Sequence, residues 1–142
     1  MMKETQAIPM QSEYKVKGFT RVELLLLRAA KLVLKRRWYD MIESGEKTEE
    51  YRAITPYWIK RLFISTIPPY SYFYKHPGEL KEWVNSGAYK PREIATFFMG
   101  YSKGRPQFSK EIRSIHVGTG RPEWGAEPGK EYLVITLGER IR

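Results

Sequence analysis

Apolar and polar residues alternate at two different periods along the chain, and each change of period predicts a new element. Residues 31–35 alternate strictly and predict a strand. Residues 36–44 change to the helical period, with Trp38 on the apolar stripe, and Gly45 stands where a helix commonly ends. Residues 48–53 alternate again, so the sequence predicts strand, helix and strand over this stretch.

The second half of the chain predicts two helices and the strands that complete a sheet. Thr55-Pro56 is typical of a helix start, with a capping side chain followed by proline at the first helical position. Residues 63–78 are rich in rings and prolines and indicate an irregular loop, and residues 79–86 return to helical spacing. The remaining strands are expected at residues 93–101, 110–118 and 131–138, with a bulge near Arg113 where the alternation slips by one residue.

These elements predict an α+β fold, a mixed and mostly antiparallel β-barrel of about five to six strands with short flanking helices. Residues 1–30 are interpreted as an N-terminal extension, partly disordered, and residues 31–142 as the domain. Within the extension, Thr20 and Glu23 have the spacing of a capping box and predict a short helix over residues 19–30, after a mobile arm of residues 1–18. No apolar run reaches the length of a membrane span and no secretory signal is recognised, so a cytoplasmic protein is expected.

The charge balance narrows the expected partners. Lys and Arg outnumber Asp and Glu by 25 to 16, a formal net charge of +9, which favours a phosphate-bearing partner. A basic surface that only aids solubility is the alternative. Aromatic residues make up 14% of the chain, so some can lie where bases stack, although most aromatic residues simply pack.

The run LKRRWYDMIESGEKTEEYR resembles the opening of ASCH domains, whose signature of glycine, lysine, acid and arginine is filled here by Gly45, Lys47, Glu50 and Arg52. The resemblance covers about residues 31–139 and implies a PUA-like barrel and RNA or a nucleoside-like ligand. The family includes an amidohydrolase acting on N4-acetylcytidine and a ribonuclease. In the amidohydrolase the lysine, a threonine and a downstream glutamate are catalytic, and this chain has Glu50 in place of the threonine.

The downstream glutamate has no motif in this chain that fixes it, and Glu123 or Glu127 is inferred only from order along the chain. The surrounding loop, residues 118–130, also contains Arg121 and Trp124. An arginine can meet a phosphate and a tryptophan can stack on a base, but a glycine-rich hairpin with Trp124 folded back on the barrel is an equal alternative.

The signature residues have a chemistry of their own. Thr48, Glu50 and Arg52 share one face of the predicted strand, so Arg52 can bind a phosphate and Glu50 can accept a proton or activate water. An internal ion pair that braces the barrel is the alternative. Lys47 lies in the preceding turn, where desolvation and the Arg52 cation would lower the pKa of its amine. The ordinary interpretation is a solvent-exposed turn lysine.

Three functions remain open on the sequence. The first is a module that binds RNA or a nucleotide or nucleoside-like ligand in a cleft lined by Lys47, Glu50 and Arg52. The second is a small hydrolase that uses Lys47, Glu50 and a second acid, either an amidohydrolase or a metal-independent ribonuclease. The third is a basic module that docks an acidic protein. No cofactor is expected, and His76 and His116 lack the spacing of metal ligands. The oligomeric state is not fixed by the sequence.

Overall fold

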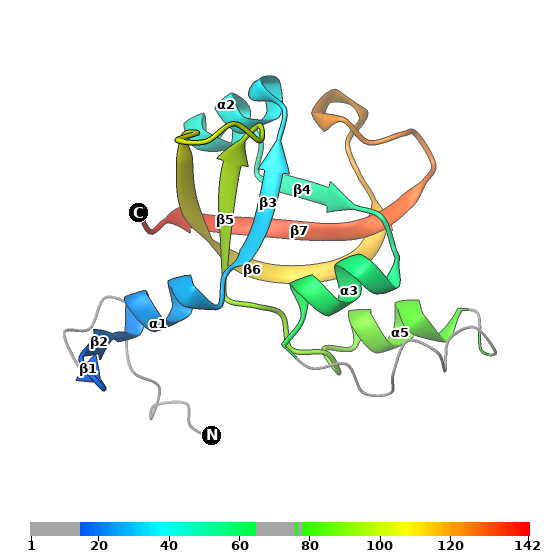
Figure 1. Ribbon diagram of the computed structural model, residues 1–142. Coiled ribbons are helices and arrows are strands. Elements are labelled where there is room, and N and C mark those ends of the chain that lie inside the picture. Colours follow the sequence, from blue (N-terminus) through cyan, green and yellow to red (C-terminus); the bar gives the residue numbers. More distant parts are fainter. Residues whose placement is uncertain (1–14, 65–75, 77) are drawn as a thin grey trace.

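A computed structural model describes residues 15–64, 76 and 78–142. It is an α+β fold around a five-stranded mixed sheet that curls into a half-barrel (Figure 1). Along the sheet the order is β3-β5-β6-β7-β4. The strands are β3 (Ala30–Leu34), β4 (Glu49–Arg52), β5 (Ile94–Met99), β6 (Gln107–Thr119) and β7 (Glu131–Arg140). The β3 and β5 strands run parallel and the other neighbours are antiparallel.

The barrel expected from the sequence is only partly formed. β3 and β4 are the two edges of the sheet, and no strand pairing joins them among the residues described. The physical reason lies in the size of the sheet, because β4 has only four residues and pairs along its whole length with β7. Five strands of this kind form part of a barrel's circumference and leave a seam between β3 and β4.

Four short helices and one 3-10 turn surround the sheet within the described residues, and their ends follow local sequence signals. They are α1 (Arg21–Leu27), α2 (Arg36–Ser44), α3 (Pro56–Leu62), α5 (Glu79–Asn85) and η2 (Pro122–Trp124). Thr20 and Glu23 form the expected capping box, and the Thr55 hydroxyl accepts from the Trp58 N–H at the start of α3. Gly45 ends α2 at φ 89°, a conformation that favours glycine.

The N-terminal residues depart from the expectation. The end of the segment predicted to be a mobile arm forms β1 (Lys15–Val16), which pairs as a small antiparallel hairpin with β2 (Phe19–Thr20), the start of the segment predicted to be helical. Residues 1–14, and most of the ring-rich loop expected at residues 63–78, lie outside the described residues. None of the helices in the described ranges combines the length and the apolar character needed to cross a bilayer.

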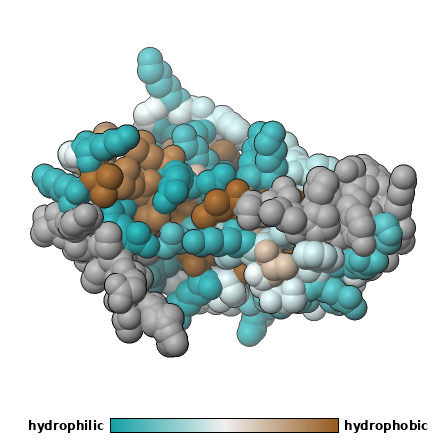
Figure 2. Space-filling view, turned by 90° about the horizontal axis from the view of Figure 1, so that it is seen from below, coloured by the Kyte–Doolittle hydropathy of each residue, from teal (hydrophilic) through white to brown (hydrophobic). Residues whose placement is uncertain are grey.

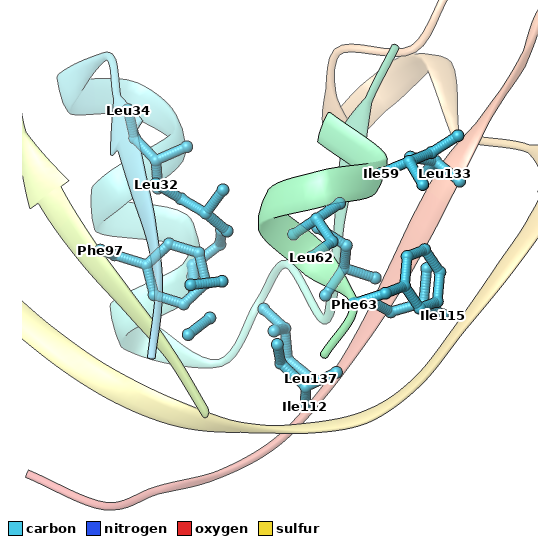
Figure 3. Close-up of a cluster of buried hydrophobic side chains, with 14 of the residues drawn as sticks. Leu32, Leu34, Ile59, Leu62, Phe63, Phe97, Ile112, Ile115, Leu133 and Leu137 are labelled. Atoms are coloured by element: carbon cyan, nitrogen blue, oxygen red, sulfur yellow. The ribbon is translucent and has the colours of Figure 1, made fainter. Parts of the chain in front are cut away.

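The hydrophobic core lies between the concave face of the sheet and α3. Figure 3 shows side chains of β3, β5, β6 and β7 meeting those of α3 and the residue after it. The labelled residues are Leu32, Leu34, Ile59, Leu62, Phe63, Phe97, Ile112, Ile115, Leu133 and Leu137. The pairing of β6 with β7 shifts register on both sides of Ile112, which confirms the bulge predicted near Arg113. α3 packs against the sheet. This packing holds the segment that connects β4 to α3 beside the seam.

Candidate functional site

Lys47 and Glu50 form a buried ion pair at the start of β4. The Lys47 Nζ atom donates to Glu50 Oε1 at 2.6 Å and to the backbone oxygen of Glu49 at 2.7 Å. The Lys47 side chain is 0% exposed and that of Glu50 is 9% exposed. The end of α2 determines the position of Lys47. The Lys47 N–H donates to the Met41 oxygen of that helix at 2.9 Å, and this bond turns the chain inward. Lys47 is therefore not a solvent-exposed turn lysine.

Arg52 binds the other oxygen of the same carboxylate. Its Nη2 atom donates to Glu50 Oε2 at 2.7 Å and to the backbone oxygen of Val33 at 3.1 Å. The guanidinium carbon lies 4.7 Å from the centroid of the Trp58 ring, and the Arg52 Nε atom is buried without a hydrogen-bond partner. Glu50 and Arg52 thus share a strand face, as their spacing predicts, and they lie at the seam between β4 and β3.

Two aromatic rings enclose the Lys47 ammonium group. Its nitrogen lies 4.9 Å from the Tyr51 ring centroid and 5.6 Å from the Trp38 ring centroid. Cation–π attraction at such distances helps to offset the loss of hydration of a buried ammonium group. Trp38 lies on the apolar stripe predicted for this helix, and it is partly buried against the core.

The loop between β6 and β7 packs over both rings. A Cβ atom on Gly120 would lie 2.6 Å from the Tyr51 ring, and one on Gly125 would lie 3.0 Å from the Trp38 ring. The Arg121 N–H donates to the Tyr51 hydroxyl at 3.0 Å, and that hydroxyl donates to Glu49 Oε1 at 2.8 Å. The loop therefore approaches the rings at contact distance, and the Lys47 ammonium is sealed beneath them.

Burial dominates the electrostatics of the site. Loss of hydration lowers the pKa of the Lys47 amine, the Arg52 cation lowers it further, and the Glu50 carboxylate opposes both effects. Burial likewise raises the pKa of the Tyr51 phenol above its ordinary value. One carboxylate, Glu50, thus serves two cations, and the Lys47 amine releases its proton more easily than a surface lysine would.

Among the described residues, the side chains of the other candidates form no hydrogen bond or ion pair with Lys47, Glu50 or Arg52. Glu123 is exposed and pairs with Arg121 at 3.5 Å, and the Arg121 guanidinium lies 4.9 Å from the centroid of the half-buried Trp124 ring. Among the described residues, no hydrogen bond or ion pair joins Glu123 to Lys47 or Glu50. Thr48 is exposed, and its backbone oxygen accepts from the Leu137 N–H at 3.0 Å. Their roles in catalysis or binding stay predictions.

Three contributors were missed by the sequence analysis: Tyr51, Trp58 and the backbone of Val33. Because side chains alternate along a strand, Tyr51 is expected on the opposite face from Glu50. No local sequence pattern shows that the Lys47 side chain contacts both of these residues. Trp58 could have been identified from the sequence. A helix is predicted to start shortly after Arg52, and side chains of its first turn can fold back onto that arginine.

No group of three or more His, Asp and Glu side chains that could hold a metal ion occurs in the part of the chain described. Comparison of the chain with protein-family models, with curated proteins and with solved structures found no match.

Proposed function

We propose that the chain is an ASCH-type domain that binds RNA or a nucleotide or nucleoside-like ligand at the seam of its half-barrel. The observation that carries the proposal is the convergence of Lys47, Glu50 and Arg52 at this seam, with rings on both sides of the ion pairs. Charged groups that fix orientation, beside aromatic surfaces that stack, are the combination that nucleobases require. The net charge of +9 supports a partner that carries phosphate.

The three charged residues have different parts in this proposal. Arg52 is the ligand-facing member, because its side chain is 16% exposed whereas that of Lys47 is fully enclosed. Lys47 and Glu50 hold the Arg52 guanidinium in place from below. The Trp58 ring, which lies against that guanidinium, supplies a stacking surface.

The test is binding of a mixed-sequence single-stranded RNA and of free nucleosides to the wild type, Arg52→Lys and Arg113→Ala. Arg113 is an exposed cation on β6 and serves as the control for general loss of charge. Arg52→Lys keeps the charge but loses the planar guanidinium, so we expect binding to weaken by roughly tenfold, with little change for Arg113→Ala. Equal affinities of all three proteins would refute the ligand site and favour docking of an acidic protein partner.

A hydrolase at the same site is the second candidate, and the buried Lys47 amine favours it. A lysine with a lowered pKa beside a carboxylate at 2.6 Å has the arrangement of a general base or nucleophile. Access requires movement of the loop that carries Gly120 and Gly125, because the ammonium is sealed in this structure.

Turnover decides this second candidate. The pure protein is incubated with N4-acetylcytidine, related acylated nucleosides and a mixed RNA, beside Lys47→Arg. Lys47→Arg keeps a cation near Glu50 but replaces the amine with a guanidinium group, which stays protonated. We expect product from the wild type alone. Absence of product from every substrate would remove the hydrolase and leave the binding module.

A further inference from the structure

A basic pocket lies against α3, the helix that also carries the Trp58 contact to Arg52. It has a volume of about 530 Å³ and forms where the end of α1, the start of β3, α3 and the segment before β5 meet. Five cationic residues and one tyrosine line it beside small and apolar groups: Arg28, Lys31, Lys60, Arg61, Arg92 and Tyr57. No carboxylate is among the described residues that line it. Figure 2 views the molecule from below, and hydrophilic side chains lie among apolar ones on that face.

Hydrogen bonds hold two of the arginines in place. Arg92 donates from Nε to the Arg61 oxygen at 2.8 Å and from Nη1 to the Arg28 oxygen at 3.0 Å. Arg61 donates from Nη1 to the Tyr57 oxygen at 3.2 Å, and its guanidinium carbon lies 3.4 Å from the centroid of the Tyr57 ring. These contacts therefore orient the two guanidinium groups, and Arg61 remains exposed.

The two lysines complete the pocket. Lys31 on β3 and Lys60 on α3 are exposed, and neither has an ion-pair partner within the described chain. Like charges gathered in one hollow repel one another, and a bound anion removes that repulsion. An arginine can donate two parallel hydrogen bonds to the oxygens of a phosphate, and a lysine attracts the same phosphate as a compact positive charge.

We propose that this pocket binds a phosphate group carried by a nucleotide or by an RNA strand. Its volume falls within the range of small-ligand sites, which suits one nucleotide unit. The proposal does not rest on the ligand site at Arg52. The two sites have no residue in common, although both involve β3 and α3, where Tyr57 lines the pocket and the neighbouring Trp58 lies against Arg52.

The test uses the full chain and calorimetric titration with inorganic phosphate, with a nucleoside monophosphate and with a short single-stranded RNA. Lys31→Ala/Lys60→Ala removes two exposed cations from the pocket and is expected to fold normally. Lys35→Ala/Lys103→Ala is the matched control, because it removes the same charge from exposed residues outside the pocket. We expect the pocket variant to bind its phosphate ligand roughly tenfold more weakly and the control to change little.

The separate titrations identify the source of the phosphate. Binding of the monophosphate indicates a free nucleotide, and binding of RNA alone indicates a strand backbone. Equal losses in the two double variants, or no binding of any of the three ligands, would overturn the proposal. Arg52→Lys is measured in parallel. If Arg52→Lys binds normally while Lys31→Ala/Lys60→Ala does not, the pocket stands and the proposed site at Arg52 fails. If only Arg52→Lys loses binding, the site at Arg52 stands and the pocket proposal fails.

Discussion

Arg52 donates to the backbone oxygen of Val33 at 3.1 Å and so links β4 to β3, the two edge strands of the open sheet. The same Nη2 atom donates to Glu50 at 2.7 Å. One guanidinium group therefore bridges the seam of the half-barrel and also neutralises part of the buried carboxylate. The stability of the fold and the proposed ligand binding both involve this residue, so the two effects have to be measured separately.

Arg52→Ala is expected to lower the free energy of unfolding by about 2 kcal/mol, because hydrogen bonds to charged groups are lost and Glu50 keeps only one cation. Urea unfolding measures the change. Arg121→Ala is the control, since Arg121 is 61% exposed and its substitution is expected to stay within about 0.5 kcal/mol. Equal effects of the two substitutions would mean that the contacts across the seam contribute nothing specific.

Glu50→Gln is expected to be more destabilising, by about 3 to 5 kcal/mol, because the buried Lys47 ammonium loses its counter-charge. Lys47→Met in the same chain removes the unpaired cation as well, so the double variant is expected to recover part of the loss. Urea unfolding of the wild type, both single variants and the double variant gives the coupling energy. Simple addition of the two single effects would show that the ion pair is not a unit.

The elements that the sequence predicts correctly depend mostly on local signals. The capping box at Thr20, the Thr55-Pro56 helix start and the glycine after α2 each depend on neighbours a few residues away, and each is present in the structure. The openness of the sheet and the parallel pairing of β3 with β5 depend on strands more than 50 residues apart, as Leu32 paired with Phe97 shows. No local pattern contains that information.

The same distinction applies to the site. Spacing along a strand was enough to place Glu50 and Arg52 on one face. The environment of Lys47 depends on the loop that brings Gly120 against Tyr51 from about 70 residues away, as the Arg121 bond to the Tyr51 hydroxyl illustrates. The sequence therefore named the charged residues but left open whether Lys47 was exposed or sealed.

Gly120→Ala tests the contact that seals Lys47. The new Cβ atom would lie 2.6 Å from the Tyr51 ring and 2.7 Å from the Ala126 Cβ atom, so the loop or the ring has to shift. We expect the free energy of unfolding to fall by about 1 to 3 kcal/mol, as for other overpacked sites. Tyr51→Ala/Gly120→Ala is the control, because without the ring the added methyl group should cost less than it does in the wild type. An unchanged cost would place the strain elsewhere in the loop.

Two buried lysines predict a rise of stability with pH. Burial lowers the pKa of Lys47 and of Lys110, whose Nζ atom donates to the Ile42 oxygen at 2.6 Å. Between the lowered pKa of the folded state and the ordinary value of 10.5, the unfolded chain binds more protons, so the free energy of unfolding increases with pH. Urea unfolding at a series of alkaline pH values below 10.5 measures the slope. Lys47→Met should flatten it, whereas Lys103→Met, at an exposed position, should leave it unchanged.

Tyr51 predicts the opposite trend at still higher pH. Burial raises the pKa of its phenol above the ordinary value of 10.0, so the folded state holds the proton that the unfolded chain loses. The stabilisation is complete below pH 10.0 and is lost as the pH rises towards the pKa of the folded state. Alkaline unfolding, followed by circular dichroism and by the ultraviolet absorbance of tyrosinate, measures this loss.

Tyr51→Phe keeps a ring beside the Lys47 ammonium but removes the hydroxyl that bridges Glu49 and the Arg121 N–H. We expect it to lose about 1 kcal/mol at neutral pH, since the Glu49 and Arg121 groups lose their bridging partner, and to show a shallower alkaline decline. Tyr101→Phe is the matched control, because it removes the same hydroxyl from a side chain that is 85% exposed. An equally steep decline in Tyr51→Phe and the wild type would assign the alkaline transition to Tyr39 and Tyr89, whose pKa values burial also raises.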